Sequence, residues 1–262
     1  MMKPTQRLLR TYRHKHFSPY KTYVDRQTHT AVILNPKVGT KSFRRIIQVA
    51  LRDVRGQEDA SSGRYRFWKR AREHAVASLG DYLHALGHPE EYKFYAFVRN
   101  PYARFKSAWT GKFAFGHETH YPPSIRGKRL AELRRFAAGQ GLAGAEENSA
   151  VPFDTFVAYA ESGQTGGRNH HWDEQCSVLL MDLLEYDRFF KLETKFREGM
   201  EHILTRLNML TDEIAEIVDT PVTMKRKPTP NTYDEALAER VHAMFARDFE
   251  TFGYDPDSWQ DL

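Results

Sequence analysis

A loop of small and basic residues, "NPKVGTKS", occupies positions 35–42. Gly39 would let the backbone come close to a ligand, and Lys37 would add a mobile ammonium group. Thr40 and Ser42 offer hydroxyl donors. A loop that enters a helix also presents unpaired N–H groups and the positive end of the helix dipole. These groups predict a site for a phosphate or sulfate group, whereas the plainer alternative is an ordinary turn with a surface lysine.

The phosphate loop of nucleoside triphosphatases does not fit this segment, because its pattern is G-x-x-x-x-G-K-[ST]. Leu34 stands five residues before Gly39, where that pattern has its first glycine. Thr40 also separates Gly39 from Lys41. The loop would therefore bind an anion in a different way.

The segment "FVRNPYARFKS" at 97–107 forms a second candidate anion site. It puts Arg99 at the end of a predicted strand and Ser107 eight residues later, on the helix that follows. An arginine and a hydroxyl from two different elements could grip a second phosphate.

Both loops join a predicted strand to a predicted helix. Apolar, β-branched residues predict a strand over 28–35, and an aromatic-rich run predicts another over 92–98. Helical spacing follows each strand, over 42–54 with Ser42 as the N-cap, and from Pro101 onward. Alternating units of this kind predict an α/β fold, a parallel β-sheet flanked by helices, with ligands at the carboxyl ends of the strands.

The rest of the pattern adds further helices and one more strand. Frequent glycine and proline between 111 and 151 indicate an insertion over the sheet edge. We expect residues 30–262 to form a single domain behind a basic arm of residues 1–29. The further elements expected are helices over 71–87, 125–136, 151–162, 195–210 and 233–254, and a strand over 188–192.

The composition indicates a folded protein without a membrane span. The chain has 262 residues, of which 40% are hydrophobic, and a formal net charge of +5. Its longest nearly apolar stretch, 176–184, contains Asp182 and is far too short to cross a bilayer. Residues 1–29 contain seven Lys or Arg and one acid, which predicts contact with an anionic polymer or a membrane surface, unless the arm is merely solvated.

Cys176 is the single cysteine, which excludes an intrachain disulfide and fits a reducing compartment. The N-terminus has no apolar segment or cleavage site typical of a secretory signal. We therefore expect a cytoplasmic protein, at most peripheral to a membrane.

At the two loops the sequence resembles the nucleotide-dependent sulfotransferases, most closely the carbohydrate branch called sulfotransferase family 2. Residues 36–43 are similar to the 5′-phosphosulfate loop of that family, and residues 97–107 match its 3′-phosphate motif, F-V-R-[DN]-P-x-x-R-x-x-S. The similarity continues through "HHWDEQ" and "YDRFFKLET" and covers residues 30–255 in order. The resemblance implies a P-loop-like nucleotide-binding fold. For a family member without a membrane anchor or signal and with one cysteine, it also implies a bacterial cytoplasmic enzyme.

The resemblance also implies a donor, 3′-phosphoadenosine 5′-phosphosulfate (PAPS), whose product is adenosine 3′,5′-bisphosphate, and no required metal. The acceptor would be a hydroxyl of a carbohydrate or glycolipid. Lys37 would stabilise the departing oxygen, while Arg99 and Ser107 would hold the 3′-phosphate. The other residues implied at the nucleotide are Val38, Gly39, Thr40, Lys41 and Ser42 around the 5′ group, and Arg226 and Lys227 in a late basic loop. Lys41 departs from the family pattern, which usually has a small residue there.

A histidine would serve as the general base for the acceptor hydroxyl. His74 precedes Arg99 by 25 residues, a position similar to that of the catalytic histidine in related enzymes. His171 competes with it for this role. Trp172, next to His171, could give a sugar ring an apolar face or could belong to the core.

Two other functions stay open on the sequence alone. A phosphotransferase that uses ATP and magnesium would need the same loops. A non-catalytic polyanion-binding protein would use the basic arm, without specific recognition of a nucleic acid. The resemblance favours a sulfotransferase that acts on a carbohydrate or glycolipid hydroxyl.

Overall fold

The computed structural model describes residues 21–54, 77–114, 123–146, 149–163, 169–219 and 232–262. It divides the chain into two compact units, Met1–Arg99 with Gln175–Lys225 and Asn100–Glu174 with Arg226–Leu262. His74, Arg226, Lys227 and the predicted arm up to residue 20 lie outside the described residues. Within the described ranges, no helix is both long and apolar enough to cross a membrane.

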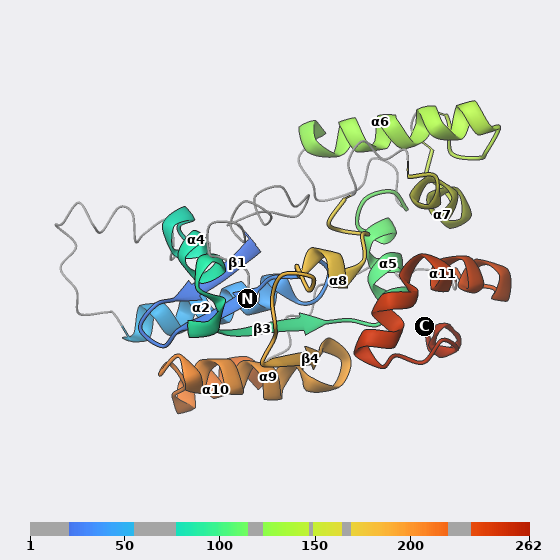
Figure 1. Ribbon diagram of the computed structural model, residues 1–262. Helices are drawn as coiled ribbons and strands as arrows, with labels where there is room; N and C mark the ends of the chain where they lie inside the picture. The colour runs from blue at the N-terminus through green and yellow to red at the C-terminus, as the bar shows by residue number, and fades with distance from the viewer. Residues whose placement is uncertain (1–20, 55–76, 115–122, 147–148, 164–168, 220–231) are drawn as a thin grey trace. The chain divides into compact units, whose positions relative to one another are not determined.

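A four-stranded sheet forms the centre of the first unit (Figure 1). In spatial order its strands are β1 (Thr22–Asp25), β2 (Thr30–Ile33), β3 (Lys93–Val98) and β4 (Arg188–Lys191). Strands β2, β3 and β4 run parallel, and β1 pairs antiparallel with β2. The predicted α/β fold with a mostly parallel sheet is therefore confirmed. Sequence analysis did not predict β1, so the paired part of the chain begins before residue 30.

Both faces of the sheet are buried, as a parallel sheet requires. Val32, Phe97 and Phe190 belong to a hydrophobic core on one face. The helices that contribute to this core are α2 (Thr40–Val54), α9 (Leu192–Arg206) and α10 (Asp212–Asp219). Ala31 and Ala96 point to the opposite face and are also buried. The unit further contains α4 (Leu79–Gly87), η2 (Pro89–Glu91) and α8 (Gln175–Val178).

The second unit is helical (Figure 1), and it has an aromatic core of its own. Phe105 stacks on Phe156 with ring centroids 4.7 Å apart, and its ring centroid lies 5.4 Å from that of Phe245. Leu130 and Leu133 of the predicted insertion belong to the same core as Phe245 of the predicted final helix. The elements of this unit are α5 (Pro101–Thr110), α6 (Pro123–Gln140), α7 (Phe153–Glu161), α11 (Glu235–Phe252) and η3 (Ser258–Asp261).

One predicted helix start is wrong, and another lies outside the described residues. Helix α2 begins at Thr40, so Ser42 lies in its first turn instead of capping it. Of the helix predicted over 71–87, residues 71–76 lie outside the described residues, and α4 begins at Leu79 after the extended Ser78. The Ser78 hydroxyl caps this helix by accepting a hydrogen bond from Asp81 N (3.0 Å).

The other predicted elements agree with the structure within a few residues. The strands over 92–98 and 188–192 are β3 and β4, and Pro101 opens α5. Helix α9 begins at Leu192, earlier than predicted. Helix α10 was not predicted, because its eight residues are too few for a clear helical period.

Helix α9 packs closely on the sheet at Gly199. A Cβ atom at this position would lie 2.6 Å from Phe190 Cγ and 2.7 Å from Phe97 Cε1. Both rings are buried in the same core, so neither has room to move away.

We expect Gly199→Ala to destabilise the protein by about 1–3 kcal/mol, because the added methyl group overpacks this core. Gly139→Ala is the matched control, since Gly139 is also helical and no described atom lies within 4 Å of its added Cβ. The control should be neutral or gain up to about 1 kcal/mol from helix propensity. Urea unfolding measures both variants, and equal stabilities would contradict close packing at Gly199.

Candidate functional site

The loop between β2 and α2 has a tightly wound backbone. Lys37 and Gly39 have φ angles of 71° and 76°, a conformation that suits glycine but strains a lysine. Thr40 Oγ1 donates a hydrogen bond to Asn35 O (2.8 Å), and Phe43 N donates to Gly39 O (3.0 Å). The hydroxyl group of Thr40 therefore donates its proton within the loop. The backbone N–H of Thr40 stays the predicted contact for an anion.

This loop rests on α9 and on the core beneath it. Val38 is buried, and a Cβ on Gly39 would lie 3.0 Å from Leu192 Cδ1. Lys37 is half-buried, whereas Lys41 is exposed. The residues predicted around the 5′ group thus form one strand-to-helix turn, with Lys41 on its solvent side.

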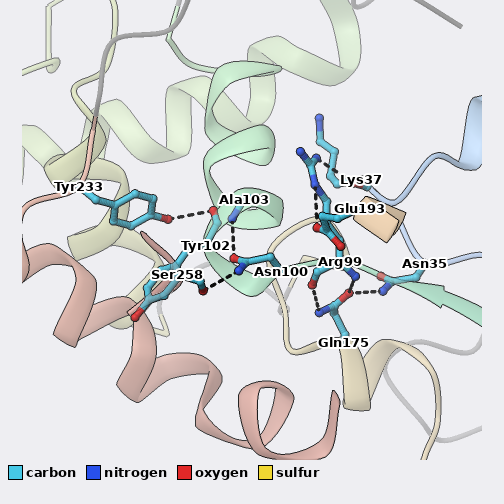
Figure 2. Close-up of polar contacts among 10 residues, drawn as sticks. All are labelled: Asn35, Lys37, Arg99, Asn100, Tyr102, Ala103, Gln175, Glu193, Tyr233 and Ser258. Atoms are coloured by element: carbon cyan, nitrogen blue, oxygen red, sulfur yellow. Dashed lines mark hydrogen bonds and ion pairs between the residues drawn. The ribbon is translucent and has the colours of Figure 1, made fainter. Parts of the chain in front are cut away.

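Arg99 follows β3 and reaches back to the first loop. Its Nη1 donates a hydrogen bond to the carbonyl oxygen of Lys37 (3.2 Å), and its Nε lies 4.0 Å from Glu193 Oε1 at the start of α9. The side chains of Lys37 and Arg99 extend in the same direction in Figure 2. Two cations beside one carboxylate give this edge of the sheet an excess of positive charge, which favours an anionic ligand.

Gln175, the first residue of α8, joins the ends of β2 and β3 (Figure 2). Its Oε1 accepts hydrogen bonds from Asn35 Nδ2 (2.8 Å) and Arg99 N (3.0 Å). Its Nε2 donates to Arg99 O (2.8 Å). Gln175 and Asn35 are both fully buried. No pattern in the sequence predicts a role for either residue, although Gln175 ends the "HHWDEQ" segment that contributes to the resemblance.

In the second unit, α5 presents the serine of the predicted 3′-phosphate motif. Asn100 caps this helix, because its Oδ1 accepts a hydrogen bond from Ala103 N (3.2 Å). Ser107 is 6% exposed, and its Oγ has no hydrogen-bond partner among the described residues. A buried hydroxyl without a partner is costly, which fits a group kept for a ligand. Arg99 and Ser107 belong to different units, so their joint contact with one phosphate stays a prediction.

The side chain of Asn169 sets the tautomer of His171. Asn169 Oδ1 accepts a hydrogen bond from His171 N (3.0 Å), and a backbone N–H can only donate, so this amide atom is the oxygen. The same oxygen lies 2.9 Å from His171 Nδ1, which must therefore carry the proton. In the neutral ring the lone pair is then on Nε2, where a general base accepts a proton.

Arg104 holds the segment that contains His171 and Trp172. Its Nη2 donates to His170 O (2.9 Å) and its Nη1 to Asp173 O (2.7 Å), so one guanidinium binds the backbone on both sides of the pair. Arg104 is 2% exposed. It lies within the predicted 3′-phosphate motif, but no sequence pattern could indicate that its partners are backbone carbonyls.

Trp172 lies in the aromatic core of the second unit. It is 4% exposed and packs edge to face against Phe156 and Phe113, with ring centroids 5.4 Å and 5.9 Å away. This position agrees with the core alternative, and a contact with a sugar ring stays a prediction. His171 beside it is half-buried.

Tyr102 is a poor candidate for a base near neutral pH. Burial raises the pKa of its hydroxyl to about 12, with smaller contributions from Asp257 and Asp255. The protonated hydroxyl donates a hydrogen bond to Pro256 O (2.8 Å). Tyr102 therefore acts as a structural donor, and histidine stays the predicted base.

The chain is similar in sequence to a protein family and to several known proteins of one enzyme class. A family model described as "Sulfotransferase family" matches residues 22–255. Carbohydrate sulfotransferase 12 of Xenopus laevis is 26% identical over 181 residues, which cover 63% of this chain and 40% of that protein. Carbohydrate sulfotransferase 8 of Homo sapiens is 25% identical over 160 residues, covering 61% of this chain and 36% of that protein.

The mouse carbohydrate sulfotransferase 8 is similar at 24% identity and 37% coverage of its length. The chain thus spans about two fifths of the length of the curated relatives it matches. No solved structure matches the chain at a comparable level of significance.

We expect Arg104→Met to destabilise the protein by roughly 2–4 kcal/mol, because two carbonyls lose a charged hydrogen-bond donor. Arg104→Lys keeps the positive charge but lacks the two-pronged guanidinium that binds both carbonyls, so its loss of stability should be intermediate. Arg135→Met is the control, since Arg135 is exposed on α6 and should change stability by less than about 0.5 kcal/mol. Thermal unfolding measures all three, and a wild-type stability for Arg104→Met would refute this role.

Proposed function

Because the chain belongs to the sulfotransferase family, we propose that it transfers a sulfuryl group from PAPS to an acceptor hydroxyl. The main support is the meeting of Lys37 and Arg99 at neighbouring strand ends, where Arg99 Nη1 binds the Lys37 carbonyl at 3.2 Å. Cations on two separate loops suit a nucleotide that has anionic groups at two positions of its ribose.

The described residues fit this donor in two further respects. Gly39 has a positive φ in a turn that enters α2, so backbone N–H groups of the first turn can approach an anion. Ser107 offers a buried hydroxyl that has no partner among the described residues. Val38, Thr40, Lys41 and Ser42 complete the proposed 5′ site, and Arg226 and Lys227 stay secondary candidates outside the described part of the chain.

When bound, the donor supplies an activated sulfuryl group on a phosphate that can leave. Lys37 would stabilise the oxygen on which negative charge grows during transfer. Arg99 and Ser107 would orient the 3′-phosphate. His171 Nε2 would take the proton of the acceptor hydroxyl, and His74 is the alternative base.

The proposed acceptor is a hydroxyl of a carbohydrate or glycolipid. Its support is that the relatives compared above are named carbohydrate sulfotransferases, at 24–26% identity. Labelled PAPS offered to polysaccharides, lipid-linked sugars and small alcohols separates these acceptor classes. In the same assay, comparing His171→Ala with His74→Ala identifies the base as the residue whose loss abolishes transfer but not donor affinity.

We expect adenosine 3′,5′-bisphosphate to stabilise the protein in the presence of a metal chelator, by about 2.7 kcal/mol at 100 times its Kd. Mg-ATP should not do so at the same concentration, because it has no 3′-phosphate. Thermal unfolding with each ligand measures the difference. Stabilisation by Mg-ATP alone would instead support the phosphotransferase alternative.

The polyanion-binding alternative predicts a different result. It requires steeply salt-dependent binding to heparin-like chains that is lost when residues 1–20 are removed. The truncation stops there because residues 22–25 form β1. Sulfuryl transfer by the truncated protein would separate the basic arm from the chemistry.

We expect Lys37→Ala to lower kcat for sulfuryl transfer by roughly 10²–10³, because the growing charge loses its electrostatic partner. The affinity for adenosine 3′,5′-bisphosphate should fall much less, since that product lacks the sulfuryl group. Lys93→Ala is the control, because Lys93 lies at the opposite end of β3 in an exposed ion pair with Asp187 (3.1 Å). Equal rates for Lys37→Ala and Lys93→Ala would exclude a catalytic Lys37.

A further inference from the structure

We propose that Gln175 is a positioning residue that holds the two donor loops at the separation that the nucleotide needs. The proposal rests on the proposed function, because it assumes that one ligand contacts both the Lys37 loop and Arg99. Gln175 itself is fully buried and would not touch the ligand. It would act through the backbone of Arg99 and through Asn35.

The pairing of β2 with β3 stops short of both functional residues. The last paired residues in the register are Ile33 and Ala96, whereas the functional side chains belong to Lys37 and Arg99. Beyond that point the Gln175 amide binds both the N–H (3.0 Å) and the carbonyl (2.8 Å) of Arg99, as the directly opposed residue does in a hydrogen-bonded antiparallel pair.

The orientation of this amide is set by its surroundings. Arg99 N can only donate and Arg99 O can only accept, so Gln175 must present Oε1 to the first and Nε2 to the second. The same Oε1 then requires a donor from Asn35, which presents Nδ2 at 2.8 Å. A rotated Gln175 amide would break all three hydrogen bonds at once.

The network continues from Asn35 into the donor loop. The Asn35 carbonyl accepts the hydrogen bond from Thr40 Oγ1 (2.8 Å), and Thr40 is the first residue of α2. One buried side chain therefore connects Arg99 to the helix start that would bind the 5′ group. A site whose two halves are fixed beforehand loses less freedom when a ligand spans them.

This role predicts a pattern that general destabilisation would not produce. Adenosine 3′,5′-bisphosphate would engage both loops, whereas 5′-AMP and 3′-AMP would each engage one. We expect Gln175→Met to weaken binding of the bisphosphate about tenfold, and binding of either monophosphate less than about threefold. Isothermal titration calorimetry on the full chain measures the three affinities.

Gln175→Glu provides a second test that depends on pH. When ionised, the introduced carboxyl can only accept, so one of its oxygens opposes the Arg99 carbonyl. When protonated, it can donate to that carbonyl and accept from Arg99 N, as the amide does. Burial raises the pKa of a carboxyl, so the introduced group should become protonated as the pH falls from about 8 to about 5.5. The ratio of the bisphosphate Kd of this variant to that of wild type should therefore approach one over this range.

Among the described residues, the charged groups near these strand ends include Lys37, Arg99, Glu193 and Lys191, and Glu174 precedes Gln175. Wild type carries the same groups, so the ratio of the two affinities is taken at each pH. Thr155→Val is the matched control: it also removes a buried hydrogen bond, from Thr155 Oγ1 to Ala143 O (3.0 Å), but in the second unit. This control should keep wild-type affinity for all three nucleotides.

The outcomes are distinguishable. If wild type does not bind the bisphosphate, the proposed function fails, and this inference fails with it. If wild type binds but Gln175→Met binds equally well, or loses affinity equally for all three nucleotides, only the positioning role is overturned. If Gln175→Met does not fold, the pH dependence of Gln175→Glu decides alone, and a ratio that does not change with pH refutes the proposal.

Discussion

The hydrogen bond from the Arg99 guanidinium to the Lys37 carbonyl is the contact on which the candidate site depends. Parallel strands bring their carboxyl ends to the same edge of the sheet, but pairing stops before either functional side chain. The hydrogen bond from Arg99 joins the two segments beyond the paired strands, because it connects the backbone of the loop after β2 to the side chain of the residue that follows β3. It also helps to hold Lys37 at a φ of 71°, which a lysine would otherwise leave for a less strained conformation.

The same contact places two cations at one edge of the sheet, and the protein compensates only partly. Glu193 Oε1 lies 4.0 Å from Arg99 Nε, and a partly exposed ion pair of that length contributes little in water. A multiply charged anion would offer the Arg99 guanidinium a stronger partner than Glu193 does. The electrostatics of this edge therefore favour a ligand with several negative charges, in agreement with a nucleotide that carries phosphate groups.

Sequence patterns predicted the parts of this site that local chemistry specifies. Gly39 and Lys37 belong to a strand-to-helix turn whose composition is informative, and Arg99 lies in a specific motif. The role of Gln175 could not be predicted, because its partners are Arg99 and Asn35, 76 and 140 residues away in the chain. Strand β1 was missed because it contains only two apolar residues, Tyr23 and Val24, and α10 because eight residues are too few for a clear helical period.

Both units hold a segment of the candidate site by hydrogen bonds to its backbone, which leaves the candidate side chains for other contacts. Gln175 binds the N–H and carbonyl of Arg99, and Arg104 binds the carbonyls on either side of the His171 and Trp172 pair. Both holding residues are buried, at 0% and 2% exposure, so water competes little for their hydrogen bonds. A guanidinium or imidazole that is placed through its own backbone can then exchange its side-chain partners without losing its position. The residues that fix these segments therefore differ from those that are proposed to touch the ligand.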